Sequence, residues 1–196
     1  MKLSDKVILV DCDGVLVDWM YSFDRWMERH GHTKIRDDVY DLAECYGIEK
    51  AEAKNFVKMF NESANIEYLP PLRDAVKYVK KLHEEYGYIF HCITSLSLDP
   101  FAQKARVKNI EALFGTTTFE RILCLDTGAD KDEALAEYKN SGCLWVEDKK
   151  ENALAGIHAG LHSVLIRHDH NEDYEHPVIK HIPRVNNWRE IYEMMA

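Results

Sequence analysis

The chain has 196 residues, 46% of them hydrophobic and 30% charged, which is enough apolar sequence for one sizeable core and a small insertion. Its 34 acidic and 25 basic side chains give a net charge of −9. This charge argues against a polynucleotide or an anionic membrane as the main partner, since both require clustered positive charge. The five cysteines form no C-x-x-C pair, and the chain has no signal-peptide pattern and no apolar run of membrane-spanning length. These features predict free thiols in a cytoplasmic protein.

Short apolar runs alternate with helical patterns along most of the chain. The first run, Val7–Val10, is followed by a segment without strands, in which helices are predicted over residues 19–30, 36–45 and 49–61. Later strands are predicted over 88–93, 121–125, 143–146 and 163–166, and helices over 72–86, Pro100–Phe114, 131–140, 149–159 and Trp188–Met195. This alternation predicts an α/β fold with a parallel sheet covered by helices on both faces.

Two carboxylates end the first predicted strand. Asp11 and Asp13 are two residues apart, so they emerge on the same side, at the edge where open α/β sheets place their active sites. Two like charges this close need a cation or a shared proton, and Gly14 lets the chain turn sharply. The pattern predicts a metal-assisted nucleophile beside an acid/base. The alternative is an ordinary strand end, because Asp and Gly are frequent where strands turn.

Later strand ends carry groups that suit an anionic substrate. Thr94 and Ser95 offer hydroxyl and backbone N–H groups to a phosphate oxygen. Lys131 opens a helix, a place that the helix dipole disfavours for a cation unless it faces an anion. Lys104 and Lys108 are rival phosphate ligands.

A second acidic pair, Glu147-Asp148, follows the apolar run 143–146. Carboxylate oxygens are suitable ligands for Mg²⁺. An isolated acidic pair would usually be solvated surface, but this chain already carries Asp11 and Asp13 at another strand end. The two pairs together predict a Mg²⁺ site.

The chain resembles the haloacid dehalogenase superfamily over nearly its whole length. The four motifs that carry the resemblance are, in order, Asp11-x-Asp13-Gly14-Val-Leu, Thr94, Lys131 and Glu147-Asp148. Within the superfamily the chain is most similar to the 5′(3′)-deoxyribonucleotidases, through its opening from Asp11 to Trp19, through residues 65–72 and through Thr94-Ser95. It differs from that group in having Glu147-Asp148, where Asp-Asp is usual, and in a longer segment between Lys131 and Glu147.

The resemblance implies a Rossmann-like α/β core, residues 1–17 and 69–196, with a small helical cap, residues 18–68, inserted after the first strand. It also implies a Mg²⁺-dependent phosphomonoesterase, in which Asp11 attacks phosphorus and Asp13 protonates the leaving oxygen and then activates water. The implied Mg²⁺ ligands are Asp11, the backbone carbonyl of Asp13, Asp148 and Glu147, the last directly or through water, and the implied phosphate contacts are Thr94, Ser95 and Lys131.

The resemblance also implies a small phosphorylated substrate, a (deoxy)ribonucleoside monophosphate from which the enzyme releases phosphate. Trp19 matches the aromatic position that stacks on a nucleobase in the resembling enzymes. Alternatively, Trp19 packs in the cap with Phe23, Trp26 and His30, which share its helix face.

Three other readings stay open. The chain could hydrolyse a sugar phosphate or another small metabolite, it could transfer the phosphoryl group, or it could be a non-catalytic binding protein with the same fold. The sequence does not reveal the oligomeric state. The histidine-rich segment 168–181 fits no familiar zinc pattern and predicts a solvated loop.

Overall fold

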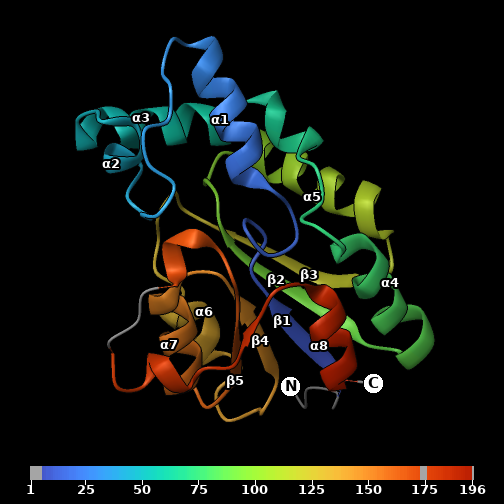
Figure 1. Ribbon diagram of the computed structural model, residues 1–196. Helices are drawn as coiled ribbons and strands as arrows, with labels where there is room; N and C mark the ends of the chain where they lie inside the picture. The colour runs from blue at the N-terminus through green and yellow to red at the C-terminus, as the bar shows by residue number, and fades with distance from the viewer. Residues whose placement is uncertain (1–5, 173–175, 196) are drawn as a thin grey trace.

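The computed structural model describes residues 6–172 and 176–195 as an α/β fold built on a six-stranded parallel sheet (Figure 1). Residues 1–5, 173–175 and 196 of the predicted core lie outside the described part. The strand order is β3-β2-β1-β4-β5-β6, with all neighbours parallel. The strands are β1 (Val7–Val10), β2 (Ile89–Ser95), β3 (Phe119–Leu125), β4 (Leu144–Glu147), β5 (His162–Ile166) and β6 (Arg184–Val185).

The predicted fold class is therefore confirmed, and five of the six strands lie where the sequence predicts them. β6 was not predicted, because two residues are too short to show any periodicity. β1 lies between β2 and β4, and all four of its residues are buried. A strand that is buried on both faces needs apolar side chains at every position, which explains the continuous run Val-Ile-Leu-Val.

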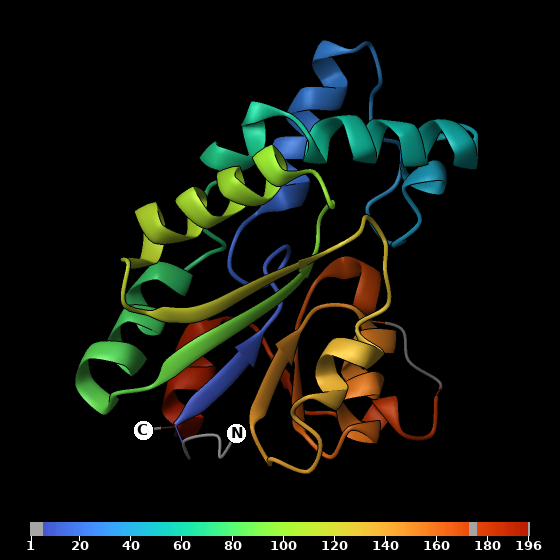
Figure 2. The same cartoon turned by 180° about the vertical axis from the view of Figure 1, so that it is seen from behind.

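Alternate residues of β1 pack into two different cores, one on each face of the sheet. Ile8 and Val10 belong to a large cluster with α4 (Ala75–Tyr86), α5 (Pro100–Phe114) and α8 (Trp188–Met195). Val7 and Leu9 belong to a second cluster with α6 (Asp132–Ala136) and α7 (Lys150–His158). Helices thus cover both faces of the sheet, as Figures 1 and 2 show from opposite sides.

Four helical segments between β1 and α4 gather above the carboxyl edge of the sheet (Figure 1). They are α1 (Trp19–Arg29), α2 (Leu42–Tyr46), α3 (Lys50–Asn61) and the 3-10 helix η1 (Ala64–Tyr68). Their buried side chains, among them Phe23, Phe60 and Ile66, belong to the same cluster as Ile8 and Val10, so these segments share the core of one sheet face.

Two predicted helices are shorter in the structure. The helix predicted over 36–45 begins only at Leu42, because Asp41 caps it by accepting a hydrogen bond from the Ala43 backbone N–H, and residues 36–41 form a loop. The helix predicted over 131–140 ends at Ala136 and continues as turns. Pro100–Phe114 agrees at both ends, since Asp99 caps its start and Pro100 occupies the first turn.

Two further 3-10 turns, η2 (Asp169–Asn171) and η3 (Ile179–His181), lie between β5 and β6. No helix within residues 6–172 and 176–195 is long and apolar enough to cross a lipid bilayer. All five cysteines are free, as expected.

Candidate active site

Three buried ionisable side chains meet at the carboxyl edge of the sheet. Asp11 directly follows β1, Glu147 ends β4, and Lys131 lies in the turn before α6. The Lys131 Nζ atom is 2.6 Å from Asp11 Oδ2 and 2.8 Å from Glu147 Oε1. Burial works against the charged lysine, but the two carboxylates outweigh it and raise the pKa of Lys131. Burial also raises the pKa of Asp11, which Lys131 opposes.

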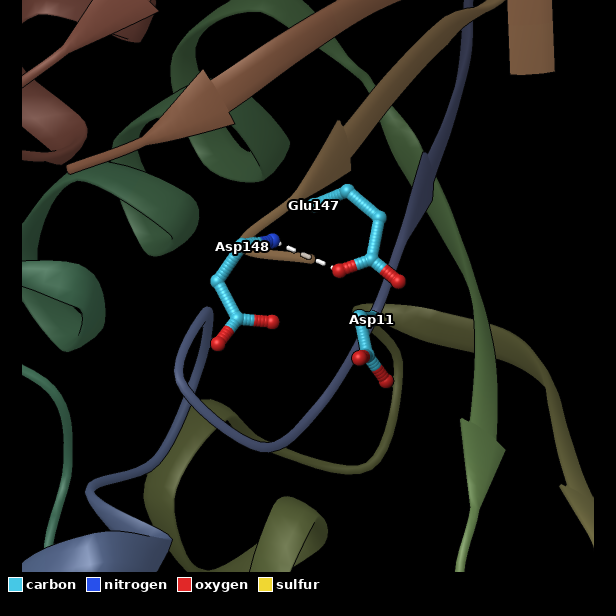
Figure 3. Close-up of side chains that lie close together, drawn as sticks. All are labelled: Asp11, Glu147 and Asp148. Atoms are coloured by element: carbon cyan, nitrogen blue, oxygen red, sulfur yellow. Dashed lines mark hydrogen bonds between the residues drawn. The ribbon is translucent and has the colours of Figure 1, made fainter. Parts of the chain in front are cut away.

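The Glu147 carboxylate accepts four hydrogen bonds. Its Oε1 atom accepts from Lys131 and from Asn152 Nδ2 at 2.6 Å, and its Oε2 atom accepts from the backbone N–H groups of Asp148 and Lys149 at 2.6 and 2.9 Å. Figure 3 shows the Asp148 bond. A carboxylate oxygen has two lone pairs, so both oxygens are fully used. Glu147 is therefore arranged to hold Lys131 in place beside Asp11.

Asp148 follows Glu147 and lies against Gly14. A Cβ atom on Gly14 would be 2.4 Å from Asp148 Oδ2, and Gly14 has a φ of +72°, so only glycine fits here without strain. Burial opposes the ionised form of Asp148, but the neighbouring His170 lowers its pKa below the ordinary value.

Asp13 pairs with a different cation, which comes from α5, on the face of the sheet opposite α6. Arg106, from α5, is fully buried, and its Nη2 atom is 2.7 Å from Asp13 Oδ1 and donates to Oδ2 at 2.9 Å. Its Nη1 atom donates to Cys12 Sγ at 2.8 Å. Burial raises the pKa of Asp13 to about 6, although Arg106 lowers it. No sequence motif singled out Arg106, since an arginine on a helix is usually a surface residue.

Thr94 and Ser95, the other predicted phosphate ligands, differ in whether their hydroxyl groups are already hydrogen-bonded. Thr94 is fully buried, and its Oγ1 atom has no hydrogen-bond partner among residues 6–172 and 176–195. Ser95 donates its hydroxyl to the Ala129 carbonyl at 2.8 Å, so this side chain holds the loop that precedes Lys131. The rivals Lys104 and Lys108 are exposed on α5, and Lys108 pairs with Glu67 at 3.1 Å. An unpaired buried hydroxyl suits a ligand oxygen, so Thr94 is the hydroxyl of this group that is free to bind one.

The histidine-rich segment is not simply a solvated loop, and this corrects the expectation from sequence. His168 donates from Nε2 to the Gly14 carbonyl at 2.7 Å, and His170 Nε2 is 3.4 Å from Asp148 Oδ2. His176 and His181 are exposed, as expected. Hydrophobic periodicity in the sequence does not indicate these contacts, because they join the loop after β5 to residues more than 20 positions away.

Tyr40 brings the helical insertion into contact with the site's rim. Its ring centroid is 5.2 Å from that of His170 and 5.2 Å from the Lys149 Nζ atom. The loop that carries Tyr40 was predicted to be helical, so its contact with the carboxyl edge could not be foreseen.

Trp19, the predicted substrate contact, is partly buried at the start of α1. Its ring stacks on Phe23 with centroids 4.5 Å apart, and its Nε1 donates to Asn61 at 2.9 Å. Asn61 in turn donates to the Leu96 carbonyl, just beyond Thr94 and Ser95. These contacts fix the indole above the end of β2.

The donor set at this edge fits a hard divalent cation. Asp11, Glu147 and Asp148 are buried and each offers an oxygen within 4.8 Å of the others (Figure 3). Because Glu147 has no free lone pair, Asp11 and Asp148 are the two carboxylates of this group that can ligate directly. Oxygen ligands of this kind match Mg²⁺.

A parallel sheet with acidic pairs at the ends of β1 and β4, a buried lysine between them and a helical insertion after β1 defines the haloacid dehalogenase class of phosphatases and hydrolases. Within that class, residues 5–196 match the family described as "5' nucleotidase, deoxy (Pyrimidine), cytosolic type C protein", and the chain belongs to it. The resemblance inferred from the four motifs is thereby confirmed, as is the expectation that the chain belongs to an enzyme family, one of phosphoric monoester hydrolases.

Individual relatives are more distant. An uncharacterised 32.4 kDa protein of enterobacteria phage T4 is 25% identical over 139 residues, which are 67% of this chain and 49% of the phage protein, so the chain spans about half the length of this curated relative. A haloacid dehalogenase-like hydrolase from Streptococcus pneumoniae has a similar structure, with a TM-score of 0.66, 14% identity and coverage of 97% and 98% of the two chains. A D,D-heptose 1,7-bisphosphate phosphatase from B. bronchiseptica, solved with magnesium and phosphate, gives a TM-score of 0.60, 14% identity and 97% coverage of both chains.

Proposed function

We propose that this protein is a Mg²⁺-dependent phosphomonoesterase that acts on nucleoside monophosphates through an aspartyl-phosphate on Asp11. The observation that carries the proposal is the buried Asp11–Lys131–Glu147 chain beside Asp148. It places a nucleophilic carboxylate next to a cation that suits phosphoryl oxygens. Membership of a nucleotidase family supports the choice of substrate class.

In the first step an Asp11 oxygen attacks phosphorus, the bond from phosphorus to the leaving oxygen breaks, and the Asp13 carboxyl gives its proton to that oxygen. In the second step Asp13 takes a proton from water, which attacks phosphorus and releases Asp11 and inorganic phosphate. Lys131 and the Thr94 hydroxyl hold phosphoryl oxygens while negative charge spreads over them. Ser95 contributes its backbone N–H, because its hydroxyl is engaged with Ala129.

Mg²⁺ would be held by carboxylate oxygens of Asp11 and Asp148 and by the Asp13 backbone carbonyl, and when bound it neutralises negative charge on the phosphoryl group. Glu147 acts by orienting Lys131, since four N–H donors already occupy its oxygens. The resemblance implies that Glu147 binds Mg²⁺ directly or through water, and this proposal gives it a positioning role instead.

Residues 18–68 are proposed to act as a cap over this edge, on a core formed by the rest of the chain. The contact of Tyr40 with His170 and Lys149 supports a closed position of the insertion. The free cysteines and the word "cytosolic" in the family's description support a cytoplasmic location.

The proposed activity is tested by measuring phosphate release from deoxy- and ribonucleoside monophosphates, sugar phosphates and a generic aryl phosphate, with Mg²⁺ and with EDTA. We expect Mg²⁺-dependent release that is fastest with a nucleotide, and none from Asp11→Asn. Faster turnover of a sugar phosphate would keep the chemistry and overturn the substrate class. Full activity of Asp11→Asn would overturn the mechanism.

The proposed contact of Trp19 with the base is tested by Trp19→Ala. Base stacking contributes about 1–3 kcal/mol, so KM for the best nucleotide should rise about 5- to 150-fold, while KM for the aryl phosphate should change little. Trp26→Ala, in the buried part of the same helix face, is the matched control for general damage to the insertion. Equal changes in KM for both substrates would show that Trp19 only packs.

A further inference from the structure

We propose that Arg106 is a positioning residue for proton transfer: it fixes the orientation of the Asp13 carboxyl at the carboxyl edge of the sheet. This inference rests on the proposed phosphatase function and assigns a role to a residue outside the four motifs. It starts from the contact of Arg106 Nη2 with both Asp13 oxygens, at 2.7 and 2.9 Å.

The burial of Arg106 is costly and calls for a reason. Its side chain is 0% exposed, and moving a guanidinium out of water costs several kcal/mol unless it is paired with good geometry. Its Nε atom is buried without a hydrogen-bond partner in the described part of the chain. A site selected for stability alone would favour an apolar residue here, since hydrophobic replacements of buried ion pairs are often neutral or stabilising.

Arg106 is also held rigidly. It lies on the buried face of α5 with Ala102, Ala105, Asn109 and Ile110. Asn109 donates to the Leu69 carbonyl at 3.0 Å, which ties this face to the segment that leaves the insertion. The second guanidinium nitrogen, Nη1, donates to Cys12 Sγ. The arginine therefore presents its Nη2 hydrogens to Asp13 from a fixed direction.

The chemical consequence follows from the carboxyl group. A carboxyl that turns freely about its Cβ–Cγ bond presents its proton in many directions. Arg106 Nη2 lies within 2.9 Å of both Asp13 oxygens, so it holds the plane of the carboxyl in one orientation while the proton is transferred. After the proton has moved to the leaving oxygen, the same guanidinium stabilises the carboxylate that remains, until Asp13 takes a proton from water.

The test compares two esters that differ in their need for a proton. An alkyl phosphate, the best one found in the substrate screen, releases a strongly basic alkoxide and needs general-acid help. A 2,4-dinitrophenyl phosphate releases a weakly basic phenolate and needs none. General acid catalysis contributes about 10²- to 10⁴-fold to the first step, and kcat/KM reports this step without the later hydrolysis that both esters share. Arg106→Met should therefore lower kcat/KM for the alkyl ester about 100-fold and for the aryl ester less than about 3-fold.

The ratio of the two rates is measured on one preparation, so it does not depend on the fraction of protein that is folded. Asn109→Leu is the matched control, because it disturbs the same buried face of α5 without touching Asp13; it should lower both rates by one factor. Arg106→Gln keeps a polar end in the site and serves as the second variant if Arg106→Met does not fold, with the same direction of change expected. In an Asp13→Asn background, adding Arg106→Met should change neither rate further.

Equal losses for the two esters in Arg106→Met or Arg106→Gln would overturn the inference and leave Arg106 a structural residue. Failure of the proposed function looks different, because the wild-type protein itself would then cleave neither ester, and the inference would fall with it.

Discussion

Asp11 and Asp13, the two carboxylates proposed to be catalytic, lie two residues apart but have different surroundings, because their partners come from the two faces of the sheet. Asp11 is coupled to Lys131 and Glu147 on the α6 side, within a group of acidic side chains suited to a cation. Asp13 is coupled to Arg106 and Cys12 on the α5 side. Two aspartates only two residues apart thus receive separate cations, one from the turn before α6 and one from α5. Lys131 favours the ionised form of Asp11, whereas burial keeps the pKa of Asp13 at about 6 in spite of Arg106.

Removing the cation that Asp11 and Glu147 share should have the largest effect on stability and activity. Lys131→Met leaves two buried carboxylates without their shared cation, and removing one partner of a buried pair costs about 3–5 kcal/mol. We expect the free energy of unfolding in EDTA to fall by about this amount and phosphate release to fall by at least about 10³-fold. Urea unfolding and steady-state kinetics measure the two.

Lys108→Met is the control for that variant, since the exposed Lys108–Glu67 pair should contribute no more than about 1 kcal/mol. Equal effects of the two lysine variants would contradict the role given to Lys131.

Mg²⁺ binding should stabilise the protein through the acidic group around Asp11. At a Mg²⁺ concentration of about 100 times Kd, binding adds about 2.7 kcal/mol to the free energy of unfolding. Asp148→Asn should abolish most of this gain, whereas Glu133→Gln, an exposed acid on α6, should retain it. Thermal unfolding with and without Mg²⁺ provides the measurement, and an undiminished gain in Asp148→Asn would remove Asp148 from the ligand set.

The pH dependence of stability should isolate the Asp13 side. In the metal-free protein the pKa of Asp13 is about 6, compared with an ordinary value of 3.8, so the folded state holds the proton that the unfolded state has lost between these values. Stability from this group is present below about pH 4 and is lost as the pH rises through 6. Its size is about 2–3 kcal/mol.

Asp13→Asn cannot titrate, so the difference in unfolding free energy between this variant and the wild type should shift in favour of the variant as the pH rises from 4 to 7 in EDTA. Parallel curves for the two proteins would contradict the raised pKa.

The smallest expected effect on stability concerns Gly14, which follows Asp13 and packs against Asp148. Gly14 and Gly87 both have a φ of +72°, but an added Cβ would lie 2.4 Å from Asp148 at Gly14 and 3.9 Å from its nearest neighbour at Gly87. Gly87→Ala should cost about 1 kcal/mol of backbone strain. Gly14→Ala should cost more than this and weaken Mg²⁺ binding as well, because it displaces the Asp148 carboxylate. Equal losses of stability with unchanged Mg²⁺ affinity in both variants would contradict this account.

The sheet was predictable because its signals are local. A buried parallel strand needs consecutive apolar residues, and the acidic pairs at 11–13 and 147–148 stand at strand ends that parallel pairing brings to one edge. The loop over 36–41 was predicted as helix, because its charge and spacing do not reveal that Asp41 caps a later start. β6 has two residues and no pattern at all.

The residues of the candidate site also include some that the sequence predicted and some that it did not. Asp11, Asp13, Thr94, Lys131 and Asp148 follow from their positions at strand ends and in motif order. Arg106 and His170 do not, since nothing in the residues around them distinguishes a buried guanidinium or a ring beside a carboxylate from solvated surface.

By itself, the sequence determined the alternation of the first five strands with helices, the carboxyl edge where the two acidic pairs meet, and the residue types that gather there. Only the tertiary structure decided which cation pairs with which aspartate, that Glu147 is saturated by N–H donors, and that His168, His170 and Tyr40 reach the site. The physical reason is that periodicity and turn signals act over a few residues. The electrostatics of a buried site are set by groups that packing brings together from distant parts of the chain, such as the 93 positions between Asp13 and Arg106.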